Sequence, residues 1–158
     1  MTGEEHIVPL NLPKTSLQLR KIDGRVHVRC LIRNKDLVLT PEEWVRQHTV
    51  AYLIQNGTSK GRIAVEYQLA YNGRIKRADI VVVDDEGNPF LLVECKAPDV
   101  SISETTLNQA AQYNKELNVR HVILTNGRSH YTIFLDVESN ECKIERVTLL
   151  NQETRILG

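Results

Sequence analysis

The alternation of apolar and polar residues between positions 63 and 96 predicts three strands joined by two turns. Ile63–Tyr71 and Arg74–Val83 flank Asn72-Gly73, a dipeptide typical of a two-residue hairpin turn. The apolar run Phe90–Val93 follows a second turn, rich in Asp, Gly, Asn and Pro. These patterns predict a three-stranded antiparallel meander over Ile63–Lys96.

The turns also predict which side chains face one another across the meander. If each hairpin closes symmetrically, Glu66, Asp79 and Glu94 are cross-strand neighbours, with Cβ atoms roughly 4.5–5.5 Å apart. Because side chains alternate along a strand, Lys96 shares the face of Glu94, and Cys95 points into the opposite layer. A row of carboxylates repels itself unless a cation lies among them. The pattern therefore predicts a site for a hard divalent cation, with Lys96 placed to orient or deprotonate a bound water.

Structural interpretations of the same residues stay open. Asp79 could pair with Arg77 or Lys76. Lys96 could be no more than the ion-pair partner of Glu94. Glu66 could be an ordinary surface residue. An unpaired carboxylate next to a run of Ile and Val is costly, so we favour the metal site for Asp79.

The rest of the pattern predicts two helices and further strands. Thr40 before Pro41, with Glu at the third helical position, indicates a helix start, and Asn56-Gly57 indicates its end. A second helix is expected over about Thr105–Leu117, opened by Ser101 or Ser103. Further strands are expected at Ser16–Ile22, Arg25–Ile32, Val119–Thr125, Ser129–Leu135 and Lys143–Leu150.

This order of elements predicts an α/β (α+β) fold. A mixed central β-sheet, made of the three-stranded antiparallel meander plus a parallel strand, is flanked by helices, with an N-terminal hairpin. A right-handed helical crossover makes Val119–Thr125 the parallel strand. Residues 1–13 are expected to be a loose leader and residues 14–158 a single domain, since 158 residues with 41% apolar content can bury a core.

The composition argues against a disulfide framework, a zinc site and a membrane helix. The three cysteines are too few and too scattered for a disulfide framework or a zinc site. The N-terminus is polar, and no apolar run approaches the roughly 20 residues of a membrane helix. We therefore expect a cytoplasmic protein without membrane association.

The charge is balanced overall but unevenly distributed. A net charge of zero argues against indiscriminate binding of nucleic acid. Residues 14–35 nevertheless carry seven Lys or Arg against one Asp, whereas residues 136–145 are acidic. Arg25 and Arg29, together with Arg77, are candidate contacts to a DNA backbone. The alternative is an ordinary solvated strand face.

The spacing of the charged residues also resembles a known family. Asp79, followed on the next strand by Glu94-x-Lys96, resembles the PD-(D/E)XK nuclease signature, with Ala78 in place of the usual Pro. Over about residues 31–134 the chain is similar to the N-terminal nuclease domain of the restriction subunit of type I restriction–modification enzymes, in a stand-alone form. The segments that carry this similarity are Leu39–His48, Arg77–Val81, Val93–Pro98, Gln109–Tyr113 and Thr125–Gly127.

The resemblance implies a restriction-endonuclease-like core and assigns roles to individual residues. The catalytic residues are then Asp79, Glu94 and Lys96. Mg²⁺, for which Mn²⁺ can substitute, is held by Asp79, Glu94, the backbone carbonyl of Cys95 and, as an additional ligand, Glu66. Gln109 and Tyr113, four residues apart on one helical face, would position the substrate, unless Gln109 only solvates the helix and Tyr113 only fills the core.

We therefore expect a Mg²⁺-dependent endodeoxyribonuclease-like domain that hydrolyses DNA phosphodiester bonds. The alternatives are a DNA- or protein-binding module of the same fold with weak or no cleavage, and a hydrolase for another phosphodiester. The sequence contains no Gly-x-x-x-x-Gly-Lys-Ser/Thr motif for an ATP-driven motor. The expected partners are thus DNA and a separate motor or specificity protein, and a homodimer is left open.

Overall fold

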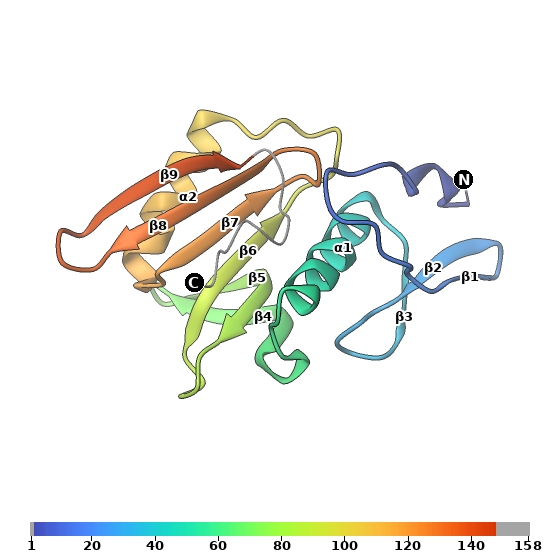
Figure 1. The fold of residues 1–158 in the computed structure, drawn as a ribbon, viewed down its shortest axis with the longest axis horizontal. Coiled ribbons are helices and arrows are strands. Elements are labelled where there is room, and N and C mark those ends of the chain that lie inside the picture. Colours follow the sequence, from blue (N-terminus) through green and yellow to red (C-terminus); the bar gives the residue numbers. More distant parts are fainter. Residues whose placement is uncertain (1, 148–158) are drawn as a thin grey trace.

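The computed structural model describes residues 2–147, which form two β-sheets and two α-helices (Figure 1). The smaller sheet contains β1 (Leu19–Ile22), β2 (Arg25–Arg29) and β3 (Asp36–Val38). The larger sheet has six strands in chain order: β4 (Ile63–Tyr71), β5 (Arg74–Val83), β6 (Pro89–Cys95), β7 (His121–Thr125), β8 (His130–Asp136) and β9 (Glu141–Val147). The helices are α1 (Pro41–Gln55) and α2 (Glu104–Leu117), and the short 3-10 turns are Glu4–His6 and Lys60–Arg62.

Both helices begin at the caps that the sequence predicts. The Thr40 hydroxyl accepts a hydrogen bond from the Glu43 backbone N–H at 3.0 Å, and Pro41 is the first residue of α1. Ser103, one of the two serines proposed, caps α2 by accepting from the Thr106 N–H at 3.2 Å. These local contacts use N–H groups that no helical carbonyl can satisfy, which is why both starts are visible in sequence.

The predicted meander is confirmed, and its register agrees with the prediction at the paired positions, although the ladders of residues 2–147 do not include the expected pairs Glu66–Asp79 and Asp79–Glu94. Val65 pairs with Ile80 and Tyr67 with Ala78 across the Asn72-Gly73 turn. Ile80 then pairs with Val93 across the second turn, where the register shifts only between Val82 and Val83. The parallel strand is confirmed as well, since Val93 pairs with Ile123 of β7 in the same direction.

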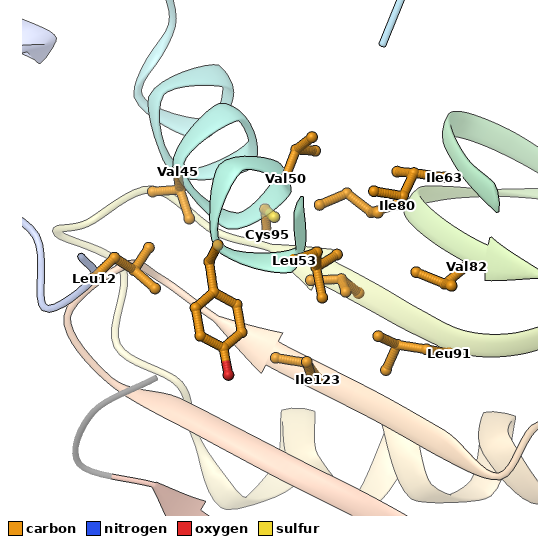
Figure 2. Close-up of a cluster of buried hydrophobic side chains, with 12 residues drawn as sticks. Leu12, Val45, Val50, Leu53, Ile63, Ile80, Val82, Leu91, Cys95 and Ile123 are labelled. Carbon is orange, nitrogen blue, oxygen red and sulfur yellow. The ribbon is translucent and has the colours of Figure 1, made fainter. Parts of the chain in front are cut away.

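The two helices cover opposite faces of the six-stranded sheet (Figure 1). Figure 2 shows the core under α1, which receives Leu91 and Cys95 of β6 and Ile123 of β7. Leu92 of β6 instead joins the core under α2. Alternate residues of β6 therefore serve two different cores, as the period of a β-strand requires.

The hairpin of β4 and β5 changes faces halfway along its length. Val65 and Ile80 pack with the core under α1, whereas the next inward-facing pair, Tyr67 and Ala78, packs with the core under α2. The change occurs at Glu66, which adopts the left-handed backbone conformation with φ 51°. The ladder of β4 and β5 has no pair at Glu66 itself, and on β5 Asp79 lies between the partners of Val65 and Tyr67. Glu66 and Asp79 therefore lie where the hairpin changes from one core to the other, and outside both apolar cores.

The N-terminal leader is not loose, which corrects one expectation. The Asn11 N–H donates to the Gly127 carbonyl at 2.7 Å, and the Trp44 indole N–H donates to the Val8 carbonyl at 2.8 Å. Leu12 is buried in the core beneath α1 (Figure 2). Apolar residues that lack periodicity, such as Val8 and Leu12, do not reveal in sequence that they pack against a distant surface.

Two further details differ from the sequence prediction. The expected N-terminal hairpin exists as β1 and β2, but β3 adds a third strand, with Arg29 paired to Asp36. The expected edge strand Lys143–Leu150 is present as β9, while its last three positions, 148–150, lie outside the described residues. Among residues 2–147, no helix is long and apolar enough to cross a membrane.

Candidate functional site

Asp79 lies where β5 separates from β6. The ladder between the two strands extends to the Ile80–Val93 pair, one residue short of the predicted facing of Asp79 and Glu94. Beyond that pair, the Asp79 side chain replaces a backbone acceptor, because its Oδ2 accepts a hydrogen bond from the Cys95 N–H at 2.8 Å. Its other oxygen, Oδ1, accepts from the Arg46 guanidinium of α1 at 3.2 Å. Asp79 thus connects the end of β6 to α1.

Glu94 is the least satisfied carboxylate of the site. Its neighbours Val93 and Cys95 both pack under α1, so its own side chain points to the α2 side of the sheet. Among residues 2–147, its Oε1 is buried without a hydrogen-bond partner. Burial, and then the charge of Asp79, raise the pKa of Glu94, although the ammonium groups of Lys76 and Lys96 act in the opposite direction. A cation brought to this carboxylate would relieve both costs.

Two lysines approach Glu94 from different strands. Lys96 follows β6, and its backbone N–H donates to the Thr125 carbonyl at 2.8 Å, which anchors it beside β7. The sequence predicts Lys76 only as an alternative ion-pair partner of Asp79. The structure places its ammonium 3.7 Å from the centre of the Tyr113 ring, close enough to act on the pKa of Glu94. The stacking of Lys76 on Tyr113 is a cation–π contact.

The two residues predicted to position substrate behave differently. Tyr113 of α2 is buried, and burial together with the charge of Glu94 raises its pKa to about 12. Gln109, one turn earlier on α2, is exposed to solvent. The Cys95 thiol points away from both, into the core under α1, and burial followed by the charge of Asp79 raises the pKa of that thiol well above its ordinary value.

Glu66 faces arginines in the structure. Its Oε2 lies 2.8 Å from the Arg33 guanidinium, and its Oε1 lies 3.4 Å from that of Arg46. Burial alone would raise the pKa of Glu66, but the hydrogen bond and charge of Arg33, aided by Arg46, lower it. The proposed role of Glu66 as a metal ligand stays a prediction.

Arg46 is the residue of this site that the sequence analysis missed. It lies on α1 within ion-pair distance of Glu66, Asp79 and also Glu43, the last at 3.4 Å. An available clue was the run of polar residues after Trp44 in a helix that must bury one side. Glu43 was assigned to the helix cap alone, whereas its carboxylate also accepts a hydrogen bond from Gln47 at 2.8 Å.

The candidate DNA contacts lie apart from the carboxylates. Arg25 and Arg29 belong to β2, in the sheet on the opposite side of α1 from the six-stranded sheet (Figure 1). Arg25 is exposed, and Arg29 lies 3.5 Å from Asp36. Arg77 is exposed on β5 opposite Gln68.

The residues present fit a cation site built on two carboxylates. No group of three or more His, Cys, Asp or Glu side chains within residues 2–147 is arranged to hold a metal ion. Asp79 and Glu94, however, are close enough for the Asp79 charge to raise the Glu94 pKa, and Glu94 carries the buried oxygen without a partner. Carboxylate oxygens are the ligands that Mg²⁺ prefers. The chemistry of this pair therefore suits a hard divalent ion.

Comparison with known proteins connects this site to restriction enzymes. A family model described as the N terminus of the type I restriction enzyme R protein (HSDR_N) matches residues 41–148, which include every residue of the carboxylate site except Arg33. No curated protein is similar enough to the chain to count as a match.

Two solved structures share the fold. One is a fragment of a protein from Vibrio vulnificus YJ016, provisionally identified as an HsdR subunit of a type I restriction enzyme. It has a TM-score of 0.50 and 19% identity, and the alignment covers 72% of this chain and 24% of that one. The other, from Anabaena variabilis ATCC 29413, belongs to DUF820 and is provisionally described as a nuclease. It has a TM-score of 0.50, 13% identity and coverage of 94% and 84%. The chain thus spans about a quarter of the HsdR fragment.

Proposed function

Because this chain belongs to the family of type I restriction enzyme R protein N termini, we propose that it is a metal-dependent deoxyribonuclease domain. The observation that carries the proposal is the buried and incompletely hydrogen-bonded carboxylate of Glu94. A buried carboxylate oxygen without a partner, beside a second carboxylate and two lysines, is costly for folding and useful for holding a divalent ion. The proposed substrate is the DNA phosphodiester bond, and the proposed ion is Mg²⁺ or Mn²⁺.

The proposed roles of the residues rest on their positions together with the family resemblance. When bound, a divalent ion supplies positive charge at the scissile phosphate and lowers the pKa of a coordinated water. Asp79 and Glu94 hold the ion, with the Cys95 carbonyl and Glu66 as candidate further ligands. Lys96 orients the attacking water or takes its proton.

The proposed substrate contacts lie partly beside this pair and partly apart from it. Tyr113 and Gln109 of α2 position the DNA strand, and Arg25, Arg29 and Arg77 contact its phosphates. A separate motor or specificity protein is proposed as a further partner. The product ends implied by the resemblance are a 5′-phosphate and a 3′-hydroxyl.

The second candidate is a DNA- or protein-binding module without cleavage. The observation that favours it is the pairing of Asp79 and Glu66 with Arg46 and Arg33. Carboxylates engaged in this way could serve only to hold α1 on the sheet. The two candidates differ in one measurable property, the cleavage of DNA in the presence of a divalent ion.

The test is incubation of the purified protein with plasmid and short duplex DNA in Mg²⁺ or Mn²⁺. We expect the wild type to cut and Lys96→Ala to cut about 10²-fold more slowly, the scale of a lost acid–base group. DNA affinity should change little in Lys96→Ala, since one phosphate contact among several is a modest loss.

Two further variants complete this experiment. Glu94→Ala should lose both metal binding and cleavage. Lys143→Ala, the same substitution at an exposed lysine of β9, is the control and should cut like the wild type. If the wild type and Lys96→Ala bind duplex equally well and neither cuts with any divalent ion, the binding module replaces the nuclease.

A further inference from the structure

Arg46 is a buried cation at the centre of the carboxylate site. It lies in the middle of α1, and its side chain is only 10% exposed. Burial opposes its charge, but the carboxylates of Glu43 and Asp79 outweigh that effect and raise its pKa. The guanidinium is therefore charged in the folded protein, and among the ion pairs of residues 2–147 it is the partner of Asp79.

The contacts of Arg46 are numerous but long. Its guanidinium nitrogens lie 3.4 Å from Glu43, 3.4 Å from Glu66 and 3.2 Å from Asp79. A charge-assisted N–H···O hydrogen bond is typically about 2.7–2.9 Å long, the length that Arg33 achieves with Glu66 at 2.8 Å. Within residues 2–147, the Nε and Nη1 atoms of Arg46 are buried without a partner in hydrogen-bonding geometry.

Buried guanidinium groups usually have their donors satisfied. Arg46 is instead held mainly by the charge of three surrounding carboxylates. This attraction holds the guanidinium in place as long as no other cation binds the carboxylates. Because several guanidinium donors form no hydrogen bond within residues 2–147, another cation can replace Arg46 without breaking a complete set of hydrogen bonds. A divalent ion at Asp79 would supply the same charge to the same oxygens.

We propose that Arg46 is an internal counter-cation, which neutralises Asp79 in the metal-free protein and which a divalent ion must displace from that carboxylate. Glu43 and Glu66 then keep the released guanidinium beside the site. Arg46 is thus a positioning residue whose pairing with Asp79 limits the affinity for the ion. This inference rests on the proposed metal site but makes a separate claim, that the chain competes with its own metal.

The test measures binding of Mg²⁺ or Mn²⁺ alone, by calorimetry on the full chain without DNA. Arg46→Met removes the charge and keeps the apolar stem, so we expect the affinity for the ion to rise by about tenfold or more. Without divalent ions the same variant should melt about 6–12 °C lower, because three carboxylates lose their shared partner. Saturating metal should recover a larger share of thermal stability in the variant than it adds to the wild type.

Arg33→Met is the matched control. Within residues 2–147, Arg33 forms an ion pair with Glu66 and none with Asp79, so its loss should change the metal affinity less than about threefold. If Arg33→Met raises the affinity as much as Arg46→Met, general charge removal explains the effect, and the proposal is overturned.

A second Arg46 variant keeps the test informative if Arg46→Met does not fold. Arg46→Lys keeps the charge but cannot span Glu66 and Asp79 with one ammonium, so the affinity should rise by a smaller factor, about threefold. An affinity that is unchanged or lower in both Arg46 variants, or absent in every protein tested, overturns the inference. Metal binding that responds to Arg46 without any DNA cleavage would support the inference and contradict the nuclease function instead.

Discussion

At the scale of single residues, the site combines one carboxylate that is poorly satisfied with another that is well paired. Glu94 has a buried oxygen without a partner and a raised pKa, caused first by burial and then by Asp79. Glu66 has a lowered pKa, because the hydrogen bond and charge of Arg33 outweigh burial. The two residues have the same side chain in opposite electrostatic settings, so their neutralisation should have opposite effects on stability.

Thermal unfolding without divalent ions tests this difference. A raised pKa means that the folded protein binds the Glu94 proton more tightly than the unfolded chain does, so stability falls as pH rises above the ordinary value of 4.5. Glu94→Gln should therefore raise the melting temperature by about 2–4 °C at pH 7. This gain should shrink toward pH 4.5.

Glu66→Gln is the opposite case and serves as the comparison. Its ordinary pKa of 4.5 is lowered on folding, so its contribution to stability is present above that value and disappears as the pH falls through the lowered pKa. Glu66→Gln should lower the melting temperature at pH 7 and have little effect in acid. Equal shifts of the same sign in both variants would contradict the assigned environments.

At the scale of elements, the N-terminal segment fastens the turn between β7 and β8. The Gly127 N–H donates to the Thr125 hydroxyl at 2.9 Å, and its carbonyl accepts from the Asn11 N–H at 2.7 Å. The Asn11 carbonyl lies 2.8 Å from Nε2 of the buried His130. A Cβ on Gly127 would come within 2.7 Å of the Leu10 side chain and 3.2 Å of that of Val45. The turn is therefore packed from outside by the segment expected to be loose.

Gly127→Ala measures the strength of this packing. Gly127 and Gly87 share φ +84°, but among residues 2–147 no atom outside Gly87 and its two chain neighbours lies within 4 Å of a Cβ built on Gly87. Gly87→Ala should therefore cost only the left-handed conformation, about 1–2 kcal/mol, and Gly127→Ala a further ~1 kcal/mol from overpacking. Denaturant unfolding gives both values. Adding Leu10→Ala should remove part of the extra loss of unfolding free energy at Gly127 and none at Gly87. Equal losses of unfolding free energy at the two glycines would show that the N-terminal segment does not pack tightly against the turn.

At the scale of the whole molecule, positive charge gathers on the three-stranded sheet. Pairing of Arg20 with His27, together with the alternation of β2, puts Arg20, Arg25, His27 and Arg29 on the face that does not carry the buried Val26 and Val28. The one acidic residue paired into this face is Asp36, opposite Arg29. The opposite end of the molecule carries β9 (Figure 1), in which two glutamates are balanced by Lys143 and Arg146. A DNA backbone would thus meet the small sheet first.

Removing two of these charges tests the orientation. Arg25→Ala with Arg29→Ala should weaken duplex binding and reduce the slope of log affinity against log salt by roughly 1–2, since each phosphate contact contributes about 0.9. Cleavage at saturating DNA should be unchanged. Lys143→Ala with Arg146→Ala on β9 is the matched control, and a similar loss there would mean that the small sheet is not the preferred face.

The parts of this protein that could be predicted from sequence depend on neighbours along the chain. The caps at Thr40 and Ser103, the Asn72-Gly73 turn and the register of Val65 with Ile80 follow from local hydrogen bonds and the two-residue period of a strand. This register also brings Asp79 near enough to Glu94 for its charge to raise the Glu94 pKa, because a tight turn leaves little freedom in pairing.

The remaining features depend on how distant elements pack. Arg46 and Asp79 are 33 residues apart and meet only because α1 lies against the end of β5. The partners of Glu66, the face change at its left-handed backbone and the burial of Leu12 likewise depend on contacts between separate elements. A long charged side chain pairs with whichever opposite charge the packed fold brings within reach, and no periodicity along the chain records that choice.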